Sequence, residues 1–271
     1  MLVDKIAHFN LQAEELTPVP QMIGKELPAA FLLNSDDWGF GYFELDEASV
    51  KVFEQSLSKV QSQLDRAVVI GQILAMMRQL AYPATRMPII MNQLMDEDNQ
   101  NLINALYGAF VSATQIYLPP ETVPKFNKEV ADFFLRKAKK EKGNDNLQMF
   151  CIDKAIAFIT EKDHLKIVSD WIHTDKISYG GEEINVKLTA DQKYTIIKSF
   201  YASPHFTLEE KKALKVKALE GDASDNAGIV SKVCDWSLPD PELKKQLWSE
   251  ITDLSSKEAL KELNLKMQGF W

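Results

Sequence analysis

From Asp46 onward, the sequence carries one helix-start signal after another. Three capping boxes, whose side chains satisfy the free amides of a first helical turn, are Thr189-x-x-Gln192, Thr207-x-x-Glu210 and Ser255-x-x-Glu258. Asp240-Pro241 places a capping carboxylate before a proline at the first helical position. With the apolar periodicity, these signals predict helices beginning near residues 48, 63, 86, 98, 120, 145, 163, 190, 207, 223, 240 and 255. The expected fold class is mainly α.

Taken in pairs, the predicted helices begin near residues 48, 86, 120, 163, 207 and 240. This irregular spacing of about 33 to 44 residues is in the range of HEAT and armadillo repeats. Each pair has an apolar stripe that one hairpin cannot bury alone, for example Ile196, Ile197, Phe200 and Tyr201. A second stripe is Leu243, Leu247, Trp248 and Ile251, and we expect Trp248 to pack in the core against the helices before and after it. We therefore expect a HEAT/armadillo-like α-solenoid of about six helical hairpins over residues 47–271. The run Ile177–Val186 is predicted to be a loop or small hairpin inserted between two helices.

Residues 1–46 carry strand-like features instead. Phe31–Leu33 is a short apolar run and Gly41–Leu45 alternates, while the turn formers Asn34–Gly39 between them predict a hairpin connection. Two or three strands are marginally stable in water by themselves. We therefore expect a short β segment at the N-terminus, the end of a β-sandwich or a strand-rich lead-in to the helices.

Composition excludes several classes of partner. The 271 residues include 31 Lys and Arg against 39 Asp and Glu, a net charge of −8, which does not suit a nucleic-acid backbone. Only two cysteines occur, so there is no disulfide framework and no Cys-rich zinc module. No apolar run approaches the roughly 18 residues of a membrane span, and the first residues lack the apolar stretch of a signal peptide. The expectation is a cytoplasmic chain with no nucleic-acid or membrane partner.

The sequence contains no self-sufficient catalytic constellation. No two histidines have the i, i+4 spacing of a hydrolytic zinc site, and each of them is predicted to be structural or solvent-exposed: His8, His164, His173 and His205. Cys151 and Cys234 fall on apolar helical stretches and are predicted to be buried small hydrophobes. No nucleophile elbow and no phosphate-binding loop occurs. We therefore assign no catalytic, cofactor-binding or metal-binding residue, and the substrate-binding residues stay unknown.

Two charged runs each allow a functional and a structural interpretation. Glu182-Glu183 follows two glycines and could clamp an amine, although a solvated turn is favoured. The basic cluster from Arg136 to Lys142 is interpreted as a solvated helix end that complements the helix dipole, in preference to a binding patch. Aromatic stripes near Phe133 and Trp171 are predicted to be core.

Several motifs follow one another with suitable gaps. The run Phe31–Asp46 reads Leu-Leu-Asn, acidic residues, Gly-aromatic, a strand and a final Asp. Later motifs are Gln63–Ala67 with its Asp-Arg-Ala, Glu220–Gly228, Leu238–Trp248 and Gly269–Trp271. In this order, over roughly residues 15–271, they resemble the C-terminal helical (ER-aminopeptidase-like) domain of the zinc aminopeptidases of the aminopeptidase N type, with the end of the preceding β-sandwich.

The resemblance implies a domain without chemistry of its own. The family's catalytic domain carries His-Glu-x-x-His, a third Glu ligand and Gly-x-Met-Glu-Asn, and none of these motifs is present in this chain. The implied parent is a zinc metalloaminopeptidase acting on peptide N-termini, with zinc in the parent and no cofactor in this chain. Whether the chain is itself an enzyme is left open.

The implied function is a non-catalytic cap that walls the substrate chamber and shapes peptide access and length selectivity. Its partners would be the catalytic domain, in the same polypeptide or in a partner chain, and peptide substrates. The alternative is a freestanding α-helical scaffold for protein–protein interaction, derived from that family. Because the family's helical domain runs past Gly-Phe-Trp by another helix pair, we expect residues 47–271 to be truncated at their C-terminal end.

Overall fold

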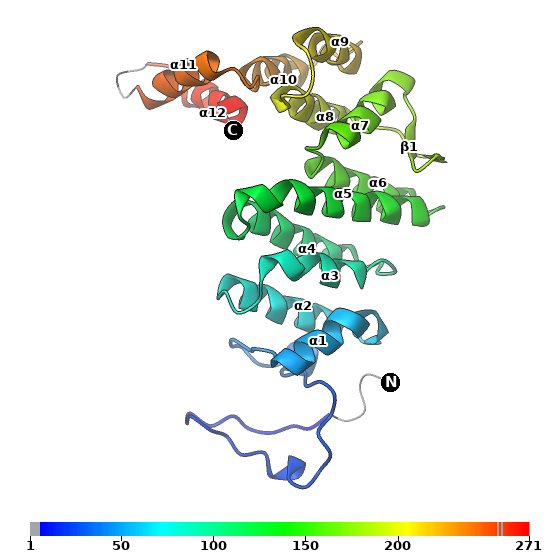
Figure 1. Ribbon diagram of the computed structural model, residues 1–271, viewed down its shortest axis with the longest axis vertical. Coiled ribbons are helices and arrows are strands. Elements are labelled where there is room, and N and C mark those ends of the chain that lie inside the picture. Colours follow the sequence, from blue (N-terminus) through cyan, green and yellow to red (C-terminus); the bar gives the residue numbers. More distant parts are fainter. Residues whose placement is uncertain (1–5, 254, 256, 271) are drawn as a thin grey trace. The chain divides into compact units, whose positions relative to one another are not determined.

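The computed structural model describes residues 6–253, 255 and 257–270. These residues form twelve α-helices and one two-stranded sheet, in two compact units, Met1–Leu118 and Pro119–Trp271. Unit 1 contains α1 (Glu47–Ser56), α2 (Gln63–Arg78), α3 (Met87–Asn92) and α4 (Gln100–Ser112) (Figure 1). Unit 2 contains α5 (Val123–Lys140), α6 (Asp145–Ala157), α7 (Lys162–Thr174), α8 (Ala190–Ala202), α9 (Leu208–Ala218), α10 (Asp225–Trp236), α11 (Pro241–Thr252) and α12 (Leu260–Phe270). The expected mainly helical fold class is confirmed.

In unit 1, helices contact the next helix but one along the chain. Helix α1 packs on α3, and α2 packs on α4 (Figure 1). The core between them is aliphatic and methionine-rich; its fully buried side chains include Leu57, Ile73, Met77, Met87, Ile90 and Phe110. A buried carboxylate ties α1 to the segment before α3, because Glu54 accepts hydrogen bonds from the Tyr82 hydroxyl at 2.7 Å and from Arg86 Nη2 at 2.6 Å. The buried carboxylate of Glu54 is thus fully paired.

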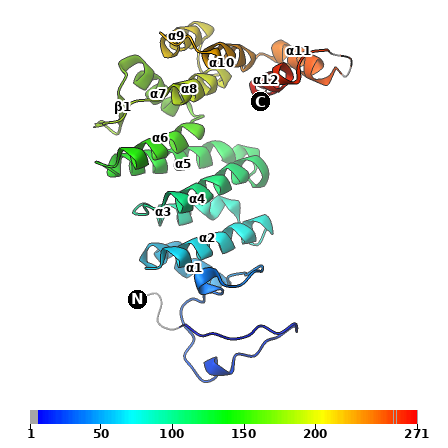
Figure 2. The same cartoon turned by 180° about the vertical axis from the view of Figure 1, so that it is seen from behind.

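Unit 2 repeats this neighbour pattern. Helices α5 and α6 form the closest pair, α6 contacts α8, α7 contacts α9, α8 contacts α10, and α10 contacts α12 (Figures 1 and 2). Its core is more aromatic than that of unit 1; the largest fully buried rings are Phe133, Phe134, Trp171 and Tyr201. The predicted core role of the stripes near Phe133 and Trp171 is confirmed.

Most local helix-start predictions are confirmed. At Thr189 and at Thr207, both side-chain-to-backbone hydrogen bonds of the capping box are present. Asp240 caps α11 just before its proline. The box predicted at Ser255 is wrong, because α12 begins five residues later at Leu260. The carboxylate of Glu258 instead accepts hydrogen bonds from Lys266 at 2.7 and 2.8 Å, and Ser255 bonds to Asp253.

Side chains near a helix start repeatedly reach back to carbonyls at the end of an earlier helix. Gln148 donates to Ala138 O at 2.9 Å, and Lys211 donates to Tyr201 O at 2.8 Å and Ser203 O at 2.7 Å. These carbonyls have no partner within their own helix. Each bond therefore joins two helices while satisfying an otherwise unpaired acceptor. Burial lowers the pKa of Lys211, because no anion compensates its charge.

At the last hairpin, Gly269 allows α12 to approach α10 closely. A Cβ atom at this position would lie 2.5 Å from Trp236 Cβ. The side chain predicted to fill the adjoining core, Trp248, is instead 52% exposed and packs on the Phe270 ring at 5.4 Å between centroids. Leu247, its neighbour on the same predicted stripe, takes the buried place. Residue 271, the last of the Gly-Phe-Trp motif, lies outside the described residues.

The β content differs from the expectation. Between residues 6 and 46 the structure has no strand, only 3₁₀ turns at Pro20–Met22 and Ser35–Asp37, so the predicted N-terminal β segment and its hairpin are wrong for these residues. Strands need a paired neighbour, and no backbone hydrogen bond joins Phe31–Leu33 to Gly41–Leu45 among the described residues. The chain does turn between the two runs, with left-handed φ angles at Asn34, Asp36 and Asp37 (58°, 63° and 55°). The role as the end of a β-sandwich stays a prediction.

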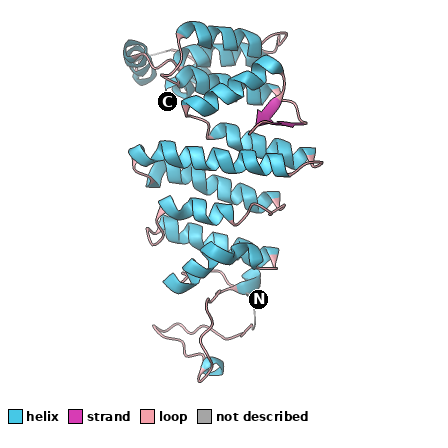
Figure 3. Ribbon diagram, turned by 45° about the vertical axis from the view of Figure 1, so that its right-hand side comes forward, coloured by secondary structure: helices cyan, strands magenta, loops and turns pink. Residues whose placement is uncertain are grey.

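The sheet lies in unit 2 instead. Strand β1 (Ile177–Tyr179) pairs antiparallel with β2 (Glu182–Ile184), which confirms the insertion predicted between two helices (Figure 3). The paired residues Ile177 and Ile184 are both buried, and Trp171 Nε1 donates to Ser178 O at 2.7 Å. The hairpin is therefore anchored on α7 by packing and by a hydrogen bond.

Candidate functional site

The N-terminal segment of unit 1 exposes an aromatic surface, which we call the aromatic edge: Trp38, Phe40 and Tyr42. The Trp38 side chain is 87% exposed, and the other two rings are also solvent-exposed. Burial alternates after Gly41, because Tyr42 and Glu44 are exposed whereas Leu45 is buried. Single exposed apolar residues are ordinary, but three large rings within five residues are typical of an interaction surface.

The backbone along this edge is unpaired. From residue 40 to residue 45, no backbone N–H or C=O group makes a hydrogen bond with the part of the chain that the structure describes. Unpaired backbone groups beside alternating side chains are characteristic of an edge strand, which another strand can pair with. The strand-like sequence pattern is therefore present without its sheet.

The base of the segment is fixed on α1 and α2. Asp65, which is buried, accepts hydrogen bonds from Ser35 Oγ at 2.8 Å and from the backbone N–H of Asp36 at 3.2 Å. Gln72 Nε2 donates to Leu33 O at 2.7 Å, and Phe31 N–H donates to Ser49 Oγ at 2.8 Å. The helices hold the segment through its backbone while the aromatic edge faces outward.

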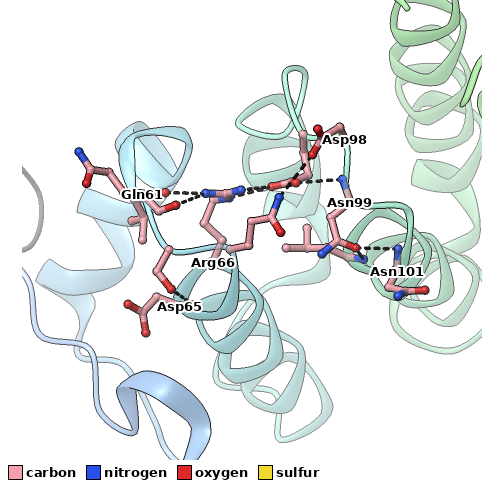
Figure 4. Close-up of polar contacts among 11 residues, drawn as sticks. Gln61, Asp65, Arg66, Asp98, Asn99 and Asn101 are labelled. Carbon is pink, nitrogen blue, oxygen red and sulfur yellow. Dashed lines mark hydrogen bonds and ion pairs between the residues drawn. The ribbon is translucent and has the colours of Figure 1, made fainter. Parts of the chain in front are cut away.

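Arg66, the next residue of the Asp-Arg-Ala motif, points away from Asp65 and bonds to the loops before α2 and α4 (Figure 4). Its guanidinium donates from Nε to Glu97 Oε2 at 2.7 Å and from Nη1 to the carbonyls of Val60 and Gln61 at 2.7 and 3.1 Å. Glu97 Oε1 accepts the N–H of Asn99, the N-cap of α4. Two adjacent residues thus fasten the N-terminal segment and the loop before α4 to one helix end.

Charge is unevenly distributed between the units. Residues 1–118 contain seven Lys and Arg against fourteen Asp and Glu, whereas residues 119–271 contain 24 against 25. No Lys or Arg occurs between Lys25 and Lys51, the interval that contains the aromatic edge and six acidic residues. A partner with a positively charged surface would therefore be favoured at this edge.

Unit 2 contains a polar cluster that no sequence motif indicated. Asp132 on α5 accepts hydrogen bonds from the Tyr179 hydroxyl at 2.6 Å and from Lys128 Nζ at 2.8 Å, and its Oδ1 lies 2.9 Å from His164 Nε2. Burial alone would raise the pKa of Asp132, but the bonds from Lys128 and Tyr179 and the charge of His164 hold it below its usual value. Burial and then Asp132 raise the pKa of Tyr179 to about 12. The cluster joins α5, α7 and β1, and its members lie too far apart in sequence for a spacing rule.

The structure supports the structural interpretation of the remaining histidines and cysteines. His8, His173 and His205 are exposed, and Nδ1 of the buried His164 has no hydrogen-bond partner among the described residues. Cys151 and Cys234 are fully buried free thiols, and burial raises the pKa of each to about 12. A thiol with such a pKa is not a ready nucleophile.

The charged runs are only partly as predicted. Glu182 and Glu183 are exposed, and each pairs with lysine, at 2.9 Å to Lys139 and 3.0 Å to Lys176, so the turn is solvated and already neutralised. In the basic cluster the solvated interpretation is wrong for Lys137. That side chain is 0% exposed and pairs with Glu141 at 3.0 Å, because its position on α5 faces the helix interface.

No described group of three or more His, Cys, Asp and Glu side chains is placed to hold a metal ion. Among the same residues, no helix is long and apolar enough to cross a membrane.

Comparison with known proteins gives a partial relationship. No family model matches the chain. Aminopeptidase N of Streptomyces lividans is 32% identical over 108 residues, which are 39% of this chain and 12% of that protein. The chain thus matches only a small part of the relative's length, and the likeness supports an aminopeptidase N relationship for that part.

Proposed function

We propose that this chain is a non-catalytic helical cap domain of a zinc aminopeptidase of the aminopeptidase N type. The observation that carries the proposal is the 32% identity to part of Aminopeptidase N, found for a chain that is mainly helical. As the resemblance implies, the chain would supply walls and contacts to the substrate chamber. Among the residues that the structure describes, no group of three or more His, Cys, Asp and Glu side chains is placed to hold a metal ion.

The helical hairpins support a HEAT/armadillo-like arrangement. Within each unit, a helix contacts the next but one, as α1 does with α3 and α8 does with α10. This is the neighbour relation by which stacked hairpins bury their apolar stripes. A curved stack of this kind offers a broad wall, which would admit a peptide tail and exclude a folded protein.

The aromatic edge supplies the attachment. Its exposed rings and unpaired backbone suit the β-sandwich that precedes the helical domain in the family, and the acidic surroundings favour a positively charged face on that partner. In this arrangement residues 31–45 gain the sheet that they lack alone. The partner is the catalytic part of the same polypeptide or of a second chain, in the cytoplasm.

The test mixes the purified chain with Streptomyces lividans aminopeptidase N from which the matched 12% has been deleted. We expect binding, and a kcat/KM that depends on peptide length more steeply than without the chain, while hydrolysis of a short aminoacyl-coumarin changes little. The double variant Trp38→Ser/Phe40→Ser should fold but fail to bind.

Two results would refute the cap role. Chelator-sensitive aminopeptidase activity in the purified chain alone would make it an enzyme. Binding that leaves the length dependence unchanged would favour the freestanding scaffold.

A further inference from the structure

A cavity of about 270 Å³ lies in unit 2, between the end of α5, the first turns of α6 and strand β2. This volume is just below the roughly 300–1,000 Å³ of pockets that hold drug-sized ligands. Among the lining residues that the structure describes, Ile184 has the one apolar side chain apart from methylene stems. The cavity therefore has the size and the polarity for a small, hydrophilic metabolite.

The cavity wall carries charges of both signs. Its charged residues are Lys139 at the end of α5, Lys142 in the loop that follows, Asp145 at the start of α6 and Glu183 on β2. A ligand with a single charge would satisfy the residues of one sign and face repulsion from the others. A ligand with both charges on neighbouring atoms can make charge-assisted hydrogen bonds to each set.

We propose that this cavity binds a small zwitterion of the free α-amino acid class. The two lysines hold its carboxylate, and Asp145 receives its ammonium group. Glu183, which pairs with Lys176 at 3.0 Å, adds negative charge beside Asp145. Gln148 and Asn185 add neutral amides to the same wall. This inference does not rest on the cap role.

The structure shows that one carboxylate fits between the two lysines. Glu182 lies 2.9 Å from Lys139 Nζ and 3.3 Å from Lys142 Nζ, so a single side chain bridges both. The Lys142 side chain is 72% exposed, that of Glu182 is 48% exposed and that of Lys139 is 31% exposed, and ion pairs in contact with solvent are weak and readily exchanged. Glu182 is therefore an internal competitor that a free carboxylate can displace.

Displacing Glu182 need not detach the hairpin. None of the other contacts that anchor the hairpin involves Glu182. Trp171 Nε1 donates to Ser178 O, the Tyr179 hydroxyl donates to Asp132, and Ile177 and Ile184 are buried. The cavity wall is thus preserved when the Glu182 carboxylate turns outward.

To test this, the full chain is titrated with three probes, and binding is measured by calorimetry and by ¹⁵N NMR. L-Alanine carries both charges, N-acetyl-L-alanine lacks the ammonium group, and L-alaninamide lacks the carboxylate. We expect L-alanine to bind at least about tenfold more tightly than either of the others. Equal binding of N-acetyl-L-alanine, or no saturable binding of L-alanine at roughly tens of millimolar, would overturn the proposal.

Variants change the affinity in opposite directions. Lys142→Gln and Asp145→Asn should each weaken L-alanine binding by about tenfold, whereas Glu182→Gln should strengthen it by about two- to fivefold because it removes the competitor. Lys125→Gln and Asp153→Asn, on the same two helices but outside the cavity, are matched controls and should change nothing. Thermal melts establish that every variant is folded. Weaker binding in Glu182→Gln, or a loss in the controls as large as at the wall, would contradict the assignment.

Discussion

Unit 1 and unit 2 use charge differently. Unit 1 has twice as many acidic as basic residues, and two of its cations are committed to largely buried partners, Arg66 to Glu97 and Arg86 to Glu54. Unit 2 is nearly balanced and carries many exposed ion pairs, of which Lys176–Glu183 is one. Exposed pairs contribute little to stability, whereas a buried pair fixes geometry and is costly to break.

The units also differ in what they leave uncovered. The aromatic edge of unit 1 presents large rings and unpaired backbone, whereas four large rings of unit 2 lie fully buried in its core: Phe133, Phe134, Trp171 and Tyr201. Unit 1 therefore leaves an aromatic surface exposed, whereas unit 2 covers four of its large rings with its own helices. Four predictions test this contrast.

The largest effect is expected from two tryptophans with opposite environments. Trp171→Ala should lower the free energy of unfolding by about 3–5 kcal/mol, because the ring is 1% exposed and its Nε1 holds the hairpin. Trp38→Ala should change it by no more than about 0.5 kcal/mol, since the ring contacts solvent. Denaturant titration measures both, and comparable losses would remove the distinction between a core in unit 2 and an uncovered edge in unit 1.

The second largest effect is expected at Glu54, the buried carboxylate of unit 1. Glu54→Gln should lower the free energy of unfolding by about 2 kcal/mol. This is below the roughly 3–5 kcal/mol typical of a fully buried ion pair, because Arg86 is partly exposed. The exposed neighbour Glu47→Gln on the same helix is the control and should leave the denaturation midpoint unchanged. A midpoint that moves equally in both variants would show that the burial of Glu54 has no special energetic role.

Two helix glycines should respond with opposite signs. Gly269→Ala places a methyl group against Trp236 and should destabilise unit 2 by about 1–3 kcal/mol. Gly71→Ala in α2 of unit 1 meets nothing within 4 Å and should stabilise by about 0.5–1 kcal/mol. Thermal unfolding of the two variants is the measurement; a stabilised Gly269→Ala would mean that α10 and α12 do not approach as closely as the structure shows.

The smallest effect is a pH dependence in unit 2. Because burial lowers the pKa of Lys211, the unfolded chain binds its proton more tightly than the folded one. The stability contributed at this site should rise as pH increases from the lowered pKa toward the ordinary value of 10.5. Lys211→Met should flatten the plot of unfolding free energy against pH over this window. Parallel plots for the two proteins would contradict the prediction.

Helices whose start signal lies within a few residues could be predicted from the sequence. The caps at Thr189, Thr207 and Asp240 act within three residues, so helix entry there is independent of the rest of the fold. The hairpin at Ile177–Ile184 was likewise visible from its glycines. The same reasoning failed at Ser255, because Lys266 takes the Glu258 carboxylate that a capping box would use.

Which residues are buried depends on the packing of helices that lie far apart in the sequence. Helical periodicity placed Trp248 and Leu247 on one stripe, but only the neighbouring helix determines that Leu247 is buried and Trp248 is half exposed. The same holds for Lys137, whose burial depends on the facing helix, and for Asp132, which meets Tyr179 across 47 residues. Such contacts depend on the packing of distant segments, which no short-range spacing encodes. Residues 40–45 have a strand's alternation but no strand, because hydrogen bonds to a second strand are what make one.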